Sequence, residues 1–404
     1  MIVRALLIFA LALPLFAADP VWIEYGPEGA IARTIVTSGG GCPAITIDGA
    51  TSVMRTRSLP AKGYEVTACE AALPAGVQSA SIGHAKLAVE KLGRTARIAL
   101  VGDTGCRLKI GNPPSIQDCS DPNAWPFAQV AESIAKWDPD LVLHVGDYYY
   151  REAACKGTKC TPAPYDWKRW HEDFFKPAAP LLEKAPWVMV RGNHEECARA
   201  AEGWFRFLDP RPYLWENGKT CKSNLDVTPP YVATVGDMQF LLLDTSSVKD
   251  SDDAAAAMYA RQLELYGKLK PGAWLMLHHP VWATSYGDLV TPTMWQAWTT
   301  AGSATSPIAF VLSGHIHLLE LLSFSDGRPP LAVVGNGGTA LDSKETDPTG
   351  SQAGGRTISG FVQSGSFGFI AATPSATGWT FDLRNADGSS KTKCAMTAAA
   401  IVCD

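Results

Sequence analysis

Apolar runs alternate with amphipathic stretches from about residue 95 to residue 340 of the chain. Short apolar runs bounded by Gly, Pro and polar residues predict buried strands, and longer stretches with one apolar face predict helices. The order of these elements predicts a layered α/β protein with a largely buried sheet. The expected strands are 97–101, 140–145, 187–190, 239–243, 274–277, 308–312 and 331–334, and the expected helices are 125–137, 166–175 and 253–269.

The sequence on either side of this region predicts β structure. Residues 20–88 are rich in Gly, Ala, Thr, Ser and Val and contain short alternating runs at 32–37 and 64–67, which are typical of strands. Turn-rich alternating sequence returns from Phe367, so we expect β-hairpins near the end of the chain. We therefore predict a small β-rich N-terminal domain at residues 19–94 and a second domain at residues 95–404.

The first 18 residues have the pattern of a secretory signal peptide. A basic start at Arg4 is followed by an apolar stretch at 5–16 and by the small residues Ala17 and Ala18. A buried first strand or helix is the alternative, and the lack of a polar face in this segment argues against it. The signal-peptide pattern predicts an exported protein, periplasmic or secreted. Because the apolar stretch is too short to span a bilayer, we expect no stable membrane anchor.

Composition narrows the classes of protein that fit. Hydrophobic residues make up 46% of the 404 positions and include 13 Trp, which is enough for a substantial core. The formal net charge of -5 argues against a nucleic-acid partner, because binding to a phosphate backbone requires a surplus of Lys and Arg.

Ten cysteines indicate an oxidising compartment. Pairing between sequence neighbours would use all of them, although spacing alone does not determine connectivity. A structural zinc site is the alternative, but the chain has no Cys-x-x-Cys pair. The neighbouring pairs are Cys42 and Cys69, Cys106 and Cys119, Cys155 and Cys160, Cys197 and Cys221, and Cys394 and Cys403.

Five polar motifs, each at the end of an apolar run, carry the candidate chemistry. Strands that end at one edge of a sheet bring their following loops to the same crevice, so residues far apart in sequence can meet there. Each motif alone has an ordinary interpretation as a turn or a core histidine, whereas their co-occurrence indicates a shared site. The motifs are Gly102-Asp103-Thr104-Gly105, Gly146-Asp147-Tyr148-Tyr149-Tyr150, Gly192-Asn193-His194-Glu195, His278-His279-Pro280 and Gly314-His315-Ile316-His317.

The residue types in these motifs are those of a two-metal hydrolytic site. Asp103 and Asp147 follow strand ends beside glycines, and one carboxylate can bridge two neighbouring cations. The amide oxygen of Asn193 is a plausible neutral ligand, and the adjacent His194 can act as an acid toward the substrate. Histidines two residues apart in an extended segment, as in Gly-His-x-His, point to the same side.

The motif order resembles that of the calcineurin-like metallophosphoesterase superfamily and, within it, of the purple acid phosphatases. The resemblance covers roughly residues 97–338 and rests on Asp-x-Gly, Gly-Asp-x-x-Tyr, Gly-Asn-His-Glu, a His after an apolar strand, and Gly-His-x-His. It implies a layered sandwich of mixed β-sheets flanked by helices, and two metal ions, Fe³⁺ with Fe²⁺, Zn²⁺ or Mn²⁺. It also implies one metal held by Asp103, Asp147, Tyr150 and His317, and a second held by Asp147, Asn193, His278 and His315.

Two of these ligand assignments have an alternative. Tyr150 stands where purple acid phosphatases have a tyrosine that ligates ferric iron, and a phenolate suits such a hard cation. Otherwise, the three consecutive tyrosines are β-prone aromatic residues at a strand end. His278 occupies the family position two residues before Pro280, and we expect His279 to point to the opposite face if the strand continues.

The resemblance implies hydrolysis of a small phosphate monoester by hydroxide generated from water at the two metals, with Asp147 as their bridge. His194 is expected to protonate the leaving group, because residues 284–288 lack the further histidines that some family members carry there. A phosphodiesterase with divalent metals only, and a metal-binding or interaction protein without activity, are the alternatives. Further candidates are Tyr286 and Arg151 as phosphate contacts, and His144 as either a partner of the site or a hydrogen-bonded core residue.

Overall fold

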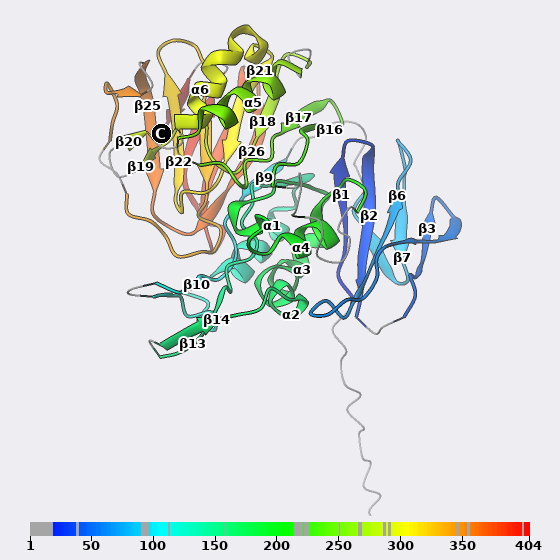
Figure 1. The fold of residues 1–404 in the computed structure, drawn as a ribbon. Coiled ribbons are helices and arrows are strands. Elements are labelled where there is room, and N and C mark those ends of the chain that lie inside the picture. The colour runs from blue at the N-terminus through cyan, green and yellow to red at the C-terminus, as the bar shows by residue number, and fades with distance from the viewer. Residues whose placement is uncertain are drawn as a thin grey trace, which may run out of the picture.

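Two large β-sheets stack face to face, and helices pack on the outer side of each sheet (Figure 1). The predicted signal peptide and the predicted boundary at residues 94 and 95 lie outside the described residues, so both stay predictions. The computed structural model describes residues 19–37, 40–89, 97–111, 114–157, 159–213, 221, 226–249, 251–265, 269–285, 288–289, 292–344, 347–353, 356–397 and 400–404.

The first sheet has eleven strands, and three predicted strands, β9, β12 and β15, run parallel near its middle. Antiparallel β26 pairs with β9 and begins the C-terminal hairpins that the turn-rich sequence predicted. The strand order is β29 (Ile401–Cys403), β28 (Ser390–Met396), β27 (Gly378–Asn385), β26 (Gly368–Ser375), β9 (Ile98–Val101), β12 (Leu141–His144), β15 (Trp187–Met189), β1 (Val21–Gly26), β2 (Gly29–Val36), β6 (Thr67–Ala72) and β5 (Arg55–Ser58).

The second sheet has eight strands, and the other four predicted strands, β17, β18, β21 and β23, form its parallel part. β16, β22, β25 and β24 complete it and were not predicted. The order is β16 (Tyr231–Val235), β17 (Met238–Leu242), β18 (Ala273–Met276), β21 (Ile308–Ser313), β23 (Leu331–Val334), β22 (Leu319–Phe324), β25 (Arg356–Ser364) and β24 (Gln352–Ala353).

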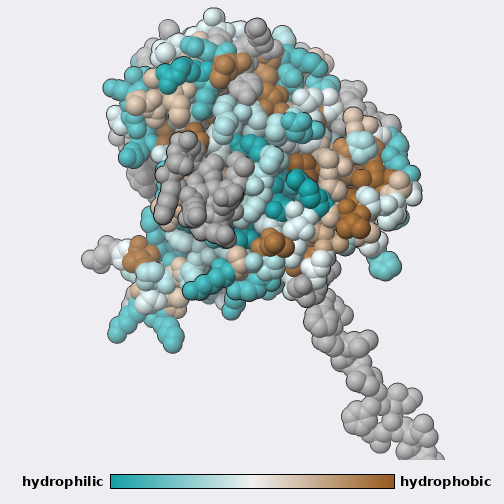
Figure 2. All heavy atoms as spheres, turned by 45° about the vertical axis from the view of Figure 1, so that its right-hand side comes forward, coloured by the Kyte–Doolittle hydropathy of each residue, from teal (hydrophilic) through white to brown (hydrophobic). Residues whose placement is uncertain are grey.

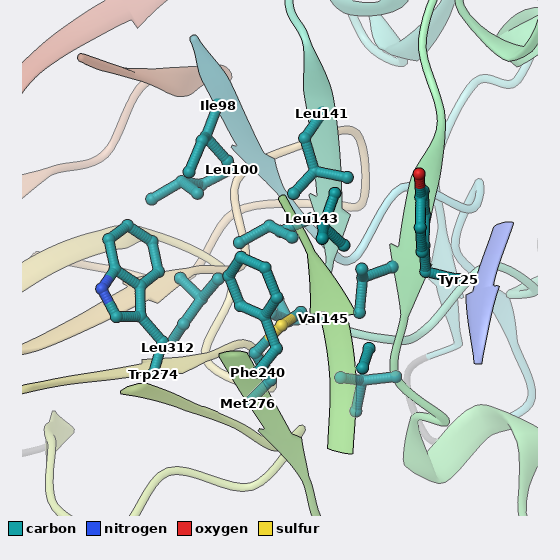
Figure 3. Packing of buried hydrophobic residues seen from close by; sticks show 14 of the residues in the cluster. Tyr25, Ile98, Leu100, Leu141, Leu143, Val145, Phe240, Trp274, Met276 and Leu312 are labelled. Carbon is teal, nitrogen blue, oxygen red and sulfur yellow. The ribbon is translucent and has the colours of Figure 1, made fainter. Parts of the chain in front are cut away.

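Alternation along the strands builds the core between the sheets. Ile98 and Leu100 of β9 point into the space between the two sheets, whereas Ala99 and Val101 pack against the helices outside. Figure 3 shows the aliphatic side chains of the first sheet opposite Trp274 and other large residues of the second. Because both faces of these strands are buried, their sequences are continuously apolar.

Helices cover both outer faces, as the amphipathic stretches predicted. The predicted helix at 166–175 is longer than expected, because α2 continues through a π-helical turn at His171–Phe175 into α3. Pro177 and Pro180 lie in α3, just after this π-helical turn. The first sheet is covered by α1 (Phe127–Trp137), α2 (Trp167–Trp170), α3 (Lys176–Leu182) and α4 (Ala201–Gly203), and the second by α5 (Asp253–Leu265) and α6 (Pro292–Ala301).

The N-terminal region is rich in strands, as predicted, and four of these strands join the first sheet. β1 pairs in parallel with β15, so β1, β2, β6 and β5 extend the sheet that carries half of the candidate site. A buried ion pair of Arg33 with Glu24 lies on this extension, and Arg57 donates to the carbonyl oxygens of Phe205 and Asp209. A further small sheet consists of β4 (Ala50–Val53), β3 (Ala44–Ile47), β7 (Ala80–Ile82) and β8 (Ala85–Leu87).

All ten cysteines form disulfides between sequence neighbours, which leaves none for a zinc site. Two of these disulfides staple short hairpins that project together from the body (Figure 1), β10 (Leu108–Lys109) with β11 (Ser115–Ile116), and β13 (Ala153–Lys156) with β14 (Lys159–Pro162). Among the described residues, no helix has both the length and the apolar character needed to cross a bilayer. On the face shown in Figure 2, hydrophobic residues occur in groups separated by hydrophilic ones.

Candidate metal centre

The predicted ligands meet at one edge of the sandwich, where parallel strands of both sheets end. β9, β12 and β15 lead into the loops of Asp103, Asp147 and Asn193. β18 and β21 of the second sheet lead into the histidine motifs. The site is therefore assembled from two half-sites, one supplied mainly by each sheet.

Local backbone geometry aims these side chains at one another. Asp103, Asp147 and His315 have φ values of 52°, 58° and 75°, a left-handed conformation that non-glycine residues rarely adopt. The buried carboxylate of Glu195 accepts hydrogen bonds from the backbone N–H groups of Asp147, Tyr148, Tyr149 and Gly192, at 2.9 to 3.1 Å. Glu195 thereby fixes the loop that carries Asp147.

One half of the site is rich in oxygen donors. The hydroxyl of Tyr150 lies 2.6 Å from Oδ2 of Asp147 and 3.3 Å from Oδ1 of Asp103. It also lies 2.8 Å from Nε2 of His317, and that nitrogen is 3.7 Å from Oδ1 of Asp103. Two carboxylates, a phenol and an imidazole are thus buried together, and we call them the oxygen cluster.

The other half is rich in nitrogen donors. Oδ1 of Asn193 lies 2.8 Å from Nε2 of His278 and 3.0 Å from Nδ1 of His315. Nε2 of His278 is also 3.2 Å from Oδ2 of Asp147, the same oxygen that Tyr150 contacts. We call Asn193, His278 and His315 the nitrogen cluster. Asp147 belongs to the oxygen cluster and also contacts the nitrogen cluster.

Burial and mutual repulsion set the charges in the site. Burial and the neighbouring Asp147 raise the pKa of Asp103 well above its ordinary value. Burial and the carboxylates of Asp147 and Asp103 raise the pKa of Tyr150 as well. Burial opposes the charge on Asp147 and on His278, but their mutual attraction outweighs it. The pKa of Asp147 is lowered and that of His278 is raised to about 9. Acidic groups that share protons in a dry site are suited to exchange them for cations.

Residues 96–319, more than half of the chain, match the model of the calcineurin-like phosphoesterase family. The chain belongs to this family. It is therefore a hydrolase of phosphoric ester bonds. No curated protein sequence matches it significantly.

Solved structures confirm the layered metallophosphoesterase fold. A purple acid phosphatase from yellow lupin (Lupinus luteus) seeds has 14% sequence identity and a TM-score of 0.59, with 93% of this chain and 73% of the lupin chain covered. A structure of PhoD has 13% identity and a TM-score of 0.58, with 97% of this chain and 93% of that chain covered. At these identities the similarity shows a common fold.

His194 lies beside Asp147 and Tyr150. Its backbone N–H donates to Oδ1 of Asp147 at 2.8 Å, and its ring packs on Tyr150 with 3.8 Å between the ring centroids. The sequence did not reveal its partner, Glu152, whose Oε1 lies 3.1 Å from Nδ1 of His194 and 3.5 Å from Nε of Arg199. The residue type and its position five residues after Asp147 were the only signals for Glu152.

The expectation that His279 points to the opposite face is wrong. β18 ends at Met276, so strand alternation no longer applies two residues later. The His279 ring lies 4.0 Å from the His315 ring, and its nitrogen is close enough to those of His278 and His315 to share a metal ion with them. Burial, reinforced by His278, lowers the pKa of His279 to about 3.

His144 is a hydrogen-bonded core residue. Its Nδ1 accepts from the backbone N–H of Gly146, and its Nε2 lies 3.0 Å from Oγ1 of Thr104. Its ring stacks on Tyr148 at 4.0 Å between centroids. These contacts confirm the interpretation as a hydrogen-bonded core residue, and a direct partnership with the site stays a prediction.

Of the two predicted phosphate contacts, Arg151 needs correction. The guanidinium of Arg151 pairs with the buried carboxylate of Asp173 and lies over the ring of Trp125, so it is already engaged. Tyr286 lies outside the described residues. Another cation, Arg107, reaches the site instead, with Nη1 2.8 Å from Nδ1 of His317. Its place two residues after the Gly-Asp-x-Gly motif is the only sequence signal for it.

Proposed function

We propose that this phosphoesterase is an exported phosphomonoesterase of the purple acid phosphatase type that works with two metal ions. The observation that carries the proposal is the position of Asp147, whose carboxylate touches both the oxygen cluster and the nitrogen cluster. One shared carboxylate between two sets of ligand atoms is the arrangement that a pair of cations requires.

The donor set fits two different ions. The oxygen cluster, Asp103, Tyr150 and His317 with Asp147, suits a hard trivalent ion, for which we propose Fe³⁺. The nitrogen cluster with Asp147 suits a divalent ion such as Fe²⁺, Zn²⁺ or Mn²⁺. These donors lie 2.6 to 3.3 Å from one another, close enough for each set to surround one cation.

The bound cations would neutralise phosphate oxygens and acidify a water for in-line attack. The protein supplies the frame for this chemistry. His278 is oriented by the backbone carbonyl of Val145, 2.8 Å from its Nδ1, so its Nε2 faces the ligand cluster. Nδ1 of His194 lies 3.1 Å from Oε1 of Glu152, and Nε2 is the atom that would deliver a proton to the departing alkoxide, an effect of roughly 10²–10⁴ in rate.

Export is supported by the five disulfides, because such bonds persist in oxidising compartments. The signal peptide predicted at residues 1–18 provides the route. We therefore place the enzyme in the periplasm or outside the cell, with a small phosphate ester as its substrate.

Elemental analysis combined with kinetics tests this function. Purified protein should hold two metal ions per chain and show a visible phenolate-to-iron band. It should hydrolyse a phosphomonoester faster than the phosphodiester of the same chromophore. Asp147→Asn should lose metal and activity, whereas Asp138→Asn, at another left-handed aspartate that pairs with Lys184 on the surface, should retain both.

Other results would select the alternatives. Preference for the diester, with divalent metals and no visible band, would identify a phosphodiesterase in which Tyr150 is not a ligand. A metal-loaded protein that hydrolyses none of a broad panel of esters would indicate a metal-binding or interaction protein.

A further inference from the structure

Arg107 carries a positive charge into the wall of the site without an anionic partner. No Asp or Glu within the described ranges forms an ion pair with it. Its Nη1 contacts Nδ1 of His317 at 2.8 Å, and its guanidinium lies 6.0 Å from the centre of the Tyr150 ring. Its Nε is buried and has no hydrogen-bond partner. Charged groups in protein interiors are normally paired, so this guanidinium retains an unused capacity to bind an anion.

The surrounding loop holds Arg107 in place. Its backbone N–H donates to Oε1 of Gln117 at 2.8 Å, and its carbonyl accepts from the backbone N–H of Gln117 at 2.9 Å. The buried amide of Gln117 also donates to the carbonyls of Ala124 and Gly338. The Cys106–Cys119 disulfide closes the same loop, and Leu108 donates to the carbonyl of Tyr150. The segment is thus fastened directly to the loop that carries the proposed ligands.

The contact between Arg107 and His317 is incompatible with the proposed ligand role of His317. A neutral imidazole that offers the lone pair of Nε2 to a metal carries its proton on Nδ1. An N–H at Nδ1 cannot accept a hydrogen bond from a guanidinium, and the carboxylate of Asp342 lies on this side of the ring, with Oδ2 3.8 Å from Nδ1. With its proton on Nδ1, His317 offers this guanidinium no acceptor, and the guanidinium is free to bind another group.

We infer that Arg107 binds the phosphate group of the substrate, taking the place that the sequence assigned to Arg151. This inference rests on the proposed function. A guanidinium presents donors in a fork that matches two phosphate oxygens. A terminal phosphomonoester has three non-bridging oxygens; cations held by the two clusters would engage two of them, and Arg107 would supply a donor for the third. The substrate class is consequently a terminal, dianionic phosphate, because a diester lacks that additional charged oxygen.

Substitution of Arg107, with binding measured apart from turnover, tests the inference. Arg107→Gln and Arg107→Lys are compared with Lys109→Gln, a control two residues further along the chain in β10. Elemental analysis gives the metal content of each variant. Calorimetric titration of the metal-loaded protein with inorganic phosphate gives its Kd, and a monoester and a diester of one chromophore give kcat/KM.

Arg107→Gln should keep two metals, weaken phosphate binding roughly 10- to 150-fold, and lower monoester kcat/KM by a similar factor, as loss of a hydrogen bond to a charged group predicts. Its diester kcat/KM should fall much less. Arg107→Lys should lie between Arg107→Gln and the wild type, because it keeps the charge without the fork. Lys109→Gln should resemble the wild type.

Wild-type phosphate affinity in a fully metallated Arg107→Gln protein would overturn the inference. Loss of metal in Arg107→Gln would also overturn it, because Arg107 would then act by supporting His317. Failure of the wild-type enzyme to hydrolyse any monoester would refute the proposed function instead, while the phosphate affinities of the variants would still decide the role of Arg107.

Discussion

Gly192 lies directly against the carboxylate shared by the two clusters, which makes Gly192→Ala a sharp test of the site. A Cβ at this position would lie 2.1 Å from Oδ1 and 2.2 Å from the backbone nitrogen of Asp147. Favourable contacts of carbon lie near about 3.5 to 4.0 Å. Gly192 has φ of -92° and ψ of 175°, an extended conformation that alanine adopts freely. The added methyl group therefore acts through its volume alone, and Asp147 must move by about 1 Å or more to admit it.

This displacement has a calculable effect on catalysis and stability. Misplacement of a reacting group by about 1 Å costs roughly 10²-fold in rate. An extra methyl group in a packed interior costs roughly 1–3 kcal/mol. Gly192→Ala should therefore bind fewer than two metals per chain, lose about two orders of magnitude in kcat/KM, and unfold at lower urea concentration. Elemental analysis, kinetics on a monoester and urea titration measure these quantities.

Gly41→Ala is the matched control. A Cβ at Gly41 would meet nothing within 4 Å, and its φ is not in the left-handed region, so this variant should resemble the wild type in all three assays. If Gly192→Ala also kept wild-type metal content and activity, the shared carboxylate would not occupy a confined position. The argument for Asp147 as the bridge would then fail.

Three other predictions concern single side chains of the site. Tyr150→Phe should abolish the visible band of the iron-loaded protein, and a retained band would exclude Tyr150 as a ligand. His278→Ala should lose metal and activity together, whereas His279→Ala should keep two metals. The reason is that only His278 contacts both Asn193 and Asp147. If both variants lost the same amount of metal, His279 would be a ligand too. In EDTA-treated protein, burial lowers the pKa of His279 to about 3, so the unfolded chain takes up the proton first as the pH falls below about 6.5. Protonation of His279 in the unfolded chain should lower the free energy of unfolding by about 2 kcal/mol between pH 7 and pH 5. His278 has the opposite effect. Its pKa is raised to about 9, so it stabilises the fold below about pH 6.5 and loses that contribution only as the pH rises toward 9. Urea titrations at both pH values, with His279→Ala as the comparison, would contradict this if the wild-type value did not fall.

Much of the catalytic half of the fold could be predicted from sequence because its signals are local. A strand buried on both faces is continuously apolar, so runs such as those of β9 and β12 stand out from their neighbours. Polar motifs directly after such runs are visible as motifs, and parallel strands bring their ends to one edge. The order of the motifs along the chain was therefore enough to predict that Asp103, Asp147 and Asn193 meet the histidines of the second sheet.

Features that depend on distant partners could not be predicted. The parallel pairing of β1 with β15 joins segments more than 160 positions apart, and no local pattern specifies it. The orientation of His279 follows from the point at which β18 stops, which the apolar run does not mark. Arg107 and Arg151 look alike in sequence, yet only Arg151 meets a buried carboxylate from the turn between α2 and α3.

Backbone strain at the ligand positions links the fold to its chemistry. Asp103, Asp147 and His315 account for three of the five non-glycine residues with positive φ in the described part of the chain, and each such residue costs roughly 1–3 kcal/mol. Hydrogen bonds from the surrounding structure hold them: Asp103 donates its N–H to the carbonyl of Gly146, and Glu195 accepts from the N–H of Asp147. A fold that required only a turn at these points would place glycine there, as it does at Gly146. Asp48 and Asp138 adopt the same backbone conformation outside the site, so the strain at Asp103, Asp147 and His315 supports their proposed role only together with the contacts that their side chains make there.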